Sequence, residues 1–291
     1  MNMADSSSPA LSFEFYPPCT PAQERRLWRT VGCLETLLPD FFSMTYGAQG
    51  SEQSKSHEIL ARLSAESEVQ VAAHLTCVGR TQDQIQVDIE RFREMGISRI
   101  VALRGDVSEE SEQSAENCFR FASDLVQLLS SDSSWDISVA AYPEVHPEAV
   151  NAQADLQALK TKLELGSQRA ITQFFYDPQV FLHFRDQAAA AGIEQPIIPG
   201  ILPVHDIEKV IRFSNRCGAD VPAGIVDEFR VWHHDPEASR ELALSLGLSL
   251  CETLKQEGVE HFHFYTLNQS DLSFDIAREL VGVRKTAIRA A

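Results

Sequence analysis

The stretch Ser12-Phe13-Glu14-Phe15-Tyr16-Pro17-Pro18 has the alternation of a short β-strand that carries a carboxylate in its middle. With a period of two residues, the two phenylalanines fall on one face and Ser12, Glu14 and Tyr16 on the other. A charge in an aromatic-rich strand is costly to bury unless it is paired or neutralised. If Glu14 is buried, its pKa should be raised, which is the profile of a general acid. The alternative is an edge strand with a wet outer face, on which Glu14 is an ordinary surface residue.

Similar apolar runs recur along the chain and alternate with longer amphipathic segments. The predicted strands are 11–16, 41–45, 69–76, 99–103, 136–142, 169–175, 197–201 and 261–266. The predicted helices are 21–38, 56–66, 82–95, 117–129, 152–165, 178–191, 207–216, 236–257 and 271–281. This order is typical of parallel strands joined by crossover helices. Eight strands predict an α/β fold of the closed (β/α)₈ TIM barrel type, with a doubly wound open sheet as the alternative.

The chain is expected to form one domain behind a short tail. Residues 1–10 are small and serine-rich, and we expect them to be disordered, with the barrel occupying residues 11–291. No Pro/Gly/Ser-rich linker divides the chain. Residues 218–235 form the longest irregular stretch, which we interpret as an elaborated loop.

Size, charge and cysteine usage exclude several classes of protein. The 291 residues, 44% of them hydrophobic, suffice for one barrel domain, which commonly takes about 250 residues. The formal net charge of −17 disfavours nucleic acids and anionic membranes as partners, since both would repel the chain. Six widely spaced cysteines without a C-x-x-C pair indicate free thiols in a reducing cytosol, so we expect a cytoplasmic location. Neither a secretory signal nor an apolar run of about 20 residues is found.

Polar residues recur where the predicted strands end. The carboxyl ends of barrel strands are where active sites form, so this recurrence predicts a functional face. Metal binding is not predicted, because the histidines lack a second ligand at helical i, i+4 spacing. The strand-end residues are Thr45, Tyr46, His74, Thr76, Arg104, Gly105, Asp106, Tyr142, Glu144, His146, Gln173, Thr266 and Asn268.

Eight segments, in this order, closely resemble the 5,10-methylenetetrahydrofolate reductase family. They are 12–18, 43–48, 73–77, 100–106, 138–147, 169–177, 197–204 and 261–268. The resemblance is to the short bacterial form without an added regulatory domain. It implies a barrel that binds FAD, takes electrons from NADH or NADPH, and reduces methylenetetrahydrofolate to 5-methyltetrahydrofolate in a ping-pong cycle.

The resemblance also implies roles for individual residues. Glu14 matches the acid that protonates the folate N10. Asp106 matches an aspartate that faces the flavin and contacts substrate, and Gln173 matches a glutamine that contacts folate and nicotinamide in turn. Thr45 matches a position near nicotinamide, and Phe213 matches an aromatic that stacks on substrate, with simple helix packing as the alternative for Phe213.

For FAD, the resemblance implies contacts from several strand ends and from two of the predicted helices. Arg104 and Lys162 would be the counter-charges of the pyrophosphate. The implied FAD contacts are Tyr46, Ala48, His74, Arg104, Gly105, Asp106, Phe121, Ala122, Tyr142, His146, Asp155, Ala158, Thr161 and Lys162.

Some positions depart from the bacterial pattern of the family. Lys209 stands where a folate-contacting glutamine is usual, and Gln269 where an arginine is usual, which suggests that the positive charge meeting the folate tail has moved. Phe121 replaces a tyrosine, and Ala158 and Thr161 replace longer polar side chains near the cofactor. The stretch 108–117 is longer and more acidic than expected for the family.

The resemblance further implies a homo-oligomer whose partners are small molecules. The choice between NADH and NADPH is left open. Two alternatives to the reductase are a flavin-free barrel lyase or aldolase, which would need a Schiff-base lysine or a metal, and a non-catalytic relative that binds flavin or folate.

Overall fold

Eight parallel strands close into a barrel in the order β1-β2-β3-β4-β5-β6-β7-β8. The computed structural model describes residues 8–46, 51–106 and 118–282, without the side chains of 51–54. The closed barrel confirms the predicted fold, and the open sheet is wrong. Two predicted segments lie outside the described residues: residues 1–7 of the tail and the acidic stretch 108–117. The strands are β1 (Ala10–Phe15), β2 (Phe41–Met44), β3 (Gln70–Thr76), β4 (Arg99–Leu103), β5 (Asp136–Ala141), β6 (Arg169–Phe174), β7 (Ile197–Ile201) and β8 (His261–Tyr265).

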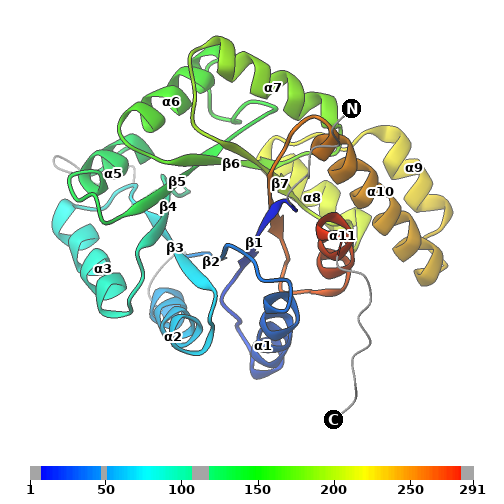
Figure 1. Ribbon diagram of the computed structural model, residues 1–291, viewed down its shortest axis with the longest axis horizontal. Coiled ribbons are helices and arrows are strands. Elements are labelled where there is room, and N and C mark those ends of the chain that lie inside the picture. The colour runs from blue at the N-terminus through cyan, green and yellow to red at the C-terminus, as the bar shows by residue number, and fades with distance from the viewer. Residues whose placement is uncertain (1–7, 47–50, 107–117, 283–291) are drawn as a thin grey trace, which may run out of the picture.

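The helices form a ring around the barrel (Figure 1). The N-termini of several are fixed by capping side chains; Thr20 and Thr81, for example, each form a capping box with the glutamine three residues on. The helices are α1 (Pro21–Glu35), α2 (Ser51–Glu66), α3 (Gln82–Glu94), α5 (Ala122–Leu129), α6 (Ala152–Glu164), α7 (Pro178–Ala190), α8 (Ile207–Cys217), α9 (Ala223–Val231), α10 (Pro236–Gln256) and α11 (Asp271–Val281).

Three segments differ from their predicted structure. The helix predicted over 56–66 begins earlier, at Ser51. The stretch 218–235, predicted as a loop, contains α9, whose Phe229 is buried against the neighbouring apolar side chains. The helix predicted over 117–129 begins only at Ala122, with Phe121 in an extended N-cap conformation. The residues before it pair instead with the loop after β3, where Phe119 N donates to Arg80 O at 2.9 Å. Backbone pairing with another segment has therefore replaced the helical hydrogen bonds of these residues.

Strand alternation divides the core into an outer and an inner layer. On β1, Leu11, Phe13 and Phe15 pack outward against the helices and are at most 2% exposed. The inner layer is closed by a small apolar cluster of Phe41, Ala72, Val101, Ile171 and Ile198. The barrel is thus a packed core, and polar side chains occupy the remaining inward positions. No helix of the described ranges is long and apolar enough to cross a bilayer.

Candidate active site

Glu14 lies on the inner face of the barrel, near the carboxyl end of β1. Its ladder neighbours are Ser43 on β2 and Tyr265 on β8. The side chain of Glu14 is 20% exposed, which leaves it in limited contact with solvent. Every strand of the barrel has two neighbours, so β1 is not an edge strand and the surface alternative for Glu14 is wrong.

Two imidazoles converge on one oxygen of the Glu14 carboxyl group. His74 Nε2, on β3, lies 3.4 Å from Glu14 Oε2, and His263 Nε2, on β8, lies 3.9 Å from the same oxygen. Both histidines are buried. No arginine or lysine pairs with Glu14 among the described residues.

These surroundings favour the neutral form of all three groups. Burial raises the pKa of Glu14, and nearby His74 offsets this only in part. Burial likewise lowers the pKa of His74, and it lowers the pKa of His263 to about 3. Burial therefore shifts Glu14 toward its protonated form and the two rings toward their neutral form, which is the direction that the sequence predicted for the pKa of a buried carboxyl group.

A serine hydroxyl links the histidines beneath Glu14. Ser12 Oγ lies 2.8 Å from His263 Nδ1 and 3.0 Å from His261 Nε2. A hydroxyl has one proton to donate, so Ser12 donates to one ring and accepts from the other. Sequence reasoning had set His261 and His263 aside as ligands. The alternation His261-Phe262-His263-Phe264-Tyr265 could have placed them, since it directs both histidines and Tyr265 inward.

The structure brings together the predicted cofactor residues of β4, β5 and α6. The ring of Tyr142 packs edge-on against His146 with centroids 4.5 Å apart. His146 N donates to Asp155 Oδ2 at 2.8 Å. Lys162 Nζ donates to Ala140 O at 2.7 Å, and burial lowers the pKa of Lys162 to about 8. A buried amine beside this wall is a suitable partner for an anionic group.

Arg104 and Asp106 follow β4 at the same end of the barrel. Arg104 forms an ion pair with Glu148, so its guanidinium already has an anionic partner. Asp106 is exposed and lies near enough to Tyr142 to contribute to the raised pKa of that phenol. Gly105, between them, has φ +86°, and a Cβ there would come within 2.9 Å of Thr76 Cβ. Only glycine allows this close approach of the two strand ends.

The other predicted cofactor residues have more varied surroundings. Tyr46 follows β2 and donates its hydroxyl to Asp88 at 2.6 Å. Phe121 is 56% exposed just before Ala122, the first residue of α5. Ala158 and Thr161 lie on α6 with Lys162. Ala48 lies outside the described residues.

The predicted substrate residues lie on four elements. Thr45 follows β2, and its backbone N donates to Phe15 O at 2.9 Å. Gln173 lies on β6 where the pairing with β7 shifts register, and its Oε1 accepts a hydrogen bond from Phe174 N at 3.0 Å. Gln269 follows β8. Phe213 and Lys209 lie on α8; Phe213 is 39% exposed, and Lys209 pairs with the nearby Asp206 at 3.4 Å. Phe213 is therefore partly covered by its neighbours, and its contact with substrate stays a prediction.

The polar atoms around Glu14 fit a bound group such as a flavin. Ser43 Oγ and His74 Nε2 are buried and have no hydrogen-bond partner among the described residues. Buried polar atoms of this kind are normally satisfied, so their presence beside an inward carboxyl group points to a ligand that completes them. The amine of Lys162 and the close approach at Gly105 fit the anionic and planar parts of a dinucleotide cofactor.

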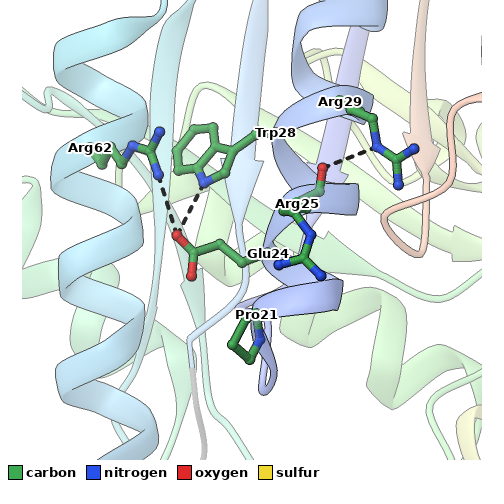
Figure 2. A pocket seen from close by; sticks show the side chains of 6 residues that line it. All are labelled: Pro21, Glu24, Arg25, Trp28, Arg29 and Arg62. Atoms are coloured by element: carbon green, nitrogen blue, oxygen red, sulfur yellow. Dashed lines mark hydrogen bonds and ion pairs between the residues drawn. The ribbon is translucent and has the colours of Figure 1, made fainter.

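A separate groove of about 710 Å³ lies on the outer surface between α1 and α2 (Figure 2). Arg62 of α2 reaches across to Glu24 of α1, at 3.3 Å, and its guanidinium lies over the ring of Trp28 at 4.1 Å. The buried face of α1, which includes Leu27 and Leu34, separates this groove from the strands. The groove is therefore not part of the site around Glu14.

A closed (β/α)₈ barrel with an inward acid and a polar wall at its carboxyl end defines a barrel enzyme. The family model described as methylenetetrahydrofolate reductase matches residues 1–281. The 5,10-methylenetetrahydrofolate reductase of Pectobacterium carotovorum is 42% identical over 96% of this chain and 92% of its own. That of Escherichia coli K12 is also 42% identical, over 94% of this chain and 91% of its own. The chain belongs to the methylenetetrahydrofolate reductase family and is an oxidoreductase, which confirms the resemblance.

A solved structure shares the fold at much lower identity. It is an uncharacterized protein from Clostridium thermocellum that binds 5-methyl-5,6,7,8-tetrahydrofolic acid. The TM-score is 0.63 at 15% identity, with 96% of this chain and 97% of the other covered. This similarity supports the barrel fold alone.

Proposed function

We propose that this chain reduces 5,10-methylenetetrahydrofolate to 5-methyltetrahydrofolate with NADH or NADPH as electron donor and FAD as cofactor. The observation that carries the proposal is the inward carboxyl group of Glu14, whose pKa is raised by burial, in a barrel of this family. Bound FAD would supply the hydride that passes from the nicotinamide to the folate. The remaining chemistry is proton transfer and binding, for which the chain has its own residues.

Glu14 is the proposed general acid. The folate five-membered ring opens when N10 takes a proton, which leaves an iminium carbon ready for hydride. A carboxyl group with a raised pKa keeps this proton to higher pH than an ordinary one, and burial raises the pKa of Glu14. The bond from N10 to the one-carbon group breaks as the N10–H bond forms.

Asp106 is the proposed electrostatic stabiliser of the iminium, and Gln173 and Phe213 are the proposed substrate-binding residues. A negative charge from Asp106 would favour the cationic iminium over the neutral ring. Gln173 would contact the two substrates in turn, since one inward amide can donate and accept. Phe213 would stack on the bound substrate with its exposed ring. Because both substrates would use the same place, the cycle would be ping-pong.

The departures at Lys209 and Gln269 concern the folate tail. The side chain of Lys209 is 63% exposed and pairs with Asp206 at the N-cap of the same helix, so its ammonium group can reach an acidic tail. A Lys209→Ala, Gln269→Ala double variant should bind folate several-fold more weakly. Unchanged folate affinity would show that the positive charge has not moved to Lys209.

Two other functions are less well supported. A Schiff-base lyase needs a buried amine, and Lys162 has one, with a pKa lowered to about 8. Lys162, however, is held by the carbonyl of Ala140, and the family is one of oxidoreductases. Family membership also favours an enzyme over a non-catalytic binder. Cytoplasmic location and a homo-oligomer stay predictions.

Anaerobic spectroscopy of the purified holoprotein tests the proposal. NADH or NADPH should bleach the flavin absorption, and methylenetetrahydrofolate should restore it with formation of 5-methyltetrahydrofolate. The nucleotide that bleaches faster is the donor. A colourless protein that reduces methylenetetrahydrofolate would show that FAD is not the cofactor. A flavoprotein that is bleached but is not reoxidised by methylenetetrahydrofolate would show that this folate is not the substrate.

A further inference from the structure

Asp88 is a carboxyl group buried in the middle of α3, away from the inner face of the barrel. Its side chain is only 4% exposed, and its helix neighbours Ile85, Ile89 and Phe92 form an apolar face against the core. A carboxylate in such a place is costly unless other groups satisfy it. A leucine would suit the packing of this face, so packing alone does not explain an aspartate at position 88.

Four side chains converge on Asp88, three from other segments and one from α3 itself. Tyr46 Oη and Arg80 Nη2 both donate to Asp88 Oδ2 at 2.6 Å. His57 Nε2, on α2, lies 3.5 Å from Oδ1, and Arg91 Nη1 lies 3.7 Å from it. Asp88 therefore connects the segment after β2, the helix α2 and the loop after β3, which are neighbours in the ring (Figure 1).

Through these contacts Asp88 holds the ring of Tyr46 in one place. The Tyr46 ring packs against His57 with centroids 5.5 Å apart, and the Arg80 guanidinium lies 5.8 Å from its centroid. Burial, together with the hydrogen bond to Asp88, raises the pKa of Tyr46 far above its ordinary value. The phenol is thus a permanent donor to Asp88, and its ring is not free to swing.

Arg80 extends the same support to the end of β3. Its guanidinium also donates to Thr76 O at 3.1 Å and to Gln84 O at 2.9 Å. Thr76 is the side chain against which Gly105 packs closely. One buried carboxylate therefore braces two neighbouring strand ends that carry proposed cofactor contacts.

We infer that Asp88 is a positioning residue for the flavin. It holds Tyr46 and, through Arg80, the end of β3, so that this side of the cofactor site is formed before the flavin binds. The inference rests on the proposed function, because FAD is the cofactor proposed there and the family resemblance implies that Tyr46 contacts it. A preformed wall lowers the ordering cost of binding, so loss of Asp88 should weaken FAD binding even where the fold survives.

The test compares Asp88→Asn with Asp136→Asn as a matched control. Asp136 also bridges two arginines, Arg99 and Arg169, but at the amino-terminal end of the barrel. Each deflavinated protein is titrated with FAD by quenching of flavin fluorescence, and its thermal unfolding without FAD is recorded. We expect both variants to unfold at lower temperature, and only Asp88→Asn to raise the FAD Kd, by about tenfold.

Tyr46→Phe then separates the phenol from the rest of the cluster. It removes only the hydrogen bond to Asp88 and should raise the FAD Kd by about threefold. The Tyr46→Phe, Asp88→Asn double variant should bind no more weakly than Asp88→Asn alone, because both changes break one contact. If Asp88→Asn and Asp136→Asn both bind FAD as the parent does, the inference is wrong while the proposed function stands. A parent protein that takes up no FAD contradicts both.

Discussion

Glu14 and Asp88 are both carboxyl groups withdrawn from solvent, but their neighbours differ in charge. Glu14 faces two imidazoles whose pKa values are lowered, and no arginine or lysine of the described residues pairs with it. Asp88 receives a phenol and the guanidinium of Arg80, with Arg91 close by. The first arrangement favours a carboxyl group that can give a proton away. The second arrangement joins the carboxyl group to several side chains and so organises its surroundings.

The largest effect is expected when the proposed acid is removed. Glu14→Gln keeps the size of the side chain but has no proton of suitable acidity, so the folate half-reaction should slow by about 10³-fold. The NADH half-reaction needs no such proton donor and should keep its rate, which makes it the internal control. Stopped-flow absorbance of the flavin follows each half-reaction separately. Normal folate turnover by this variant would show that Glu14 is not the acid.

Removing the carboxyl group of Asp88 should lower the stability of the fold. Asp88→Ala leaves Arg80, whose side chain is 19% exposed, without its anionic partner, and should lower the free energy of unfolding by about 3 kcal/mol. Asp186→Ala is the matched control, since the Asp186 side chain is 71% exposed and its pair with Arg185 should contribute less than about 1 kcal/mol. Urea unfolding measures both. Equal losses in the two variants would contradict the anchoring role of Asp88.

A smaller effect is expected at the hydroxyl beneath Glu14. Ser12→Ala leaves a ring nitrogen of His263 and one of His261 without their buried partner, at a cost of about 2 kcal/mol in unfolding free energy. The folate half-reaction should slow as well, because His263 is no longer held beside Glu14. Ser138→Ala is the control, since Ser138 is also buried on a strand but contacts Arg169 instead. If the Ser12→Ala protein is as stable as the Ser138→Ala protein, the hydrogen bonds of Ser12 to His261 and His263 do not stabilise the fold as expected.

The smallest effect is a pH dependence of stability. Because burial raises the folded-state pKa of Glu14 above its ordinary 4.5, the folded chain binds a proton that the unfolded chain has released. The contribution of Glu14 to stability is therefore fully present below pH 4.5 and is lost as pH rises through the raised pKa. The stability of the parent relative to Glu14→Gln should fall over this interval in urea unfolding. A difference that rises with pH would mean that Glu14 is stabilised as a carboxylate.

Much of the fold could be predicted from alternation alone. The strands Arg99–Leu103 and Ile197–Ile201 and the helix Asp271–Val281 have their predicted limits, because their apolar patterns end sharply at turn residues. The helix α9 was missed, since nine residues after a proline carry too short a pattern. Alternation in the first strand singled out Glu14, and strand-end reasoning singled out His74 and the residues around Tyr142. Neither could single out Asp88, which lies on a helix and whose partner Tyr46 is 42 residues away in sequence.

The sequence by itself determined the barrel, the family and the inward side of Glu14, because these depend on periodicity and on the order of segments along the chain. Only the tertiary structure decided which groups surround each buried carboxyl group. A carboxyl group's protonation depends on the solvent and charges within a few ångströms of it, and those come from distant strands and helices. A carboxyl group is therefore a proposed acid at position 14 and a proposed anchor at position 88.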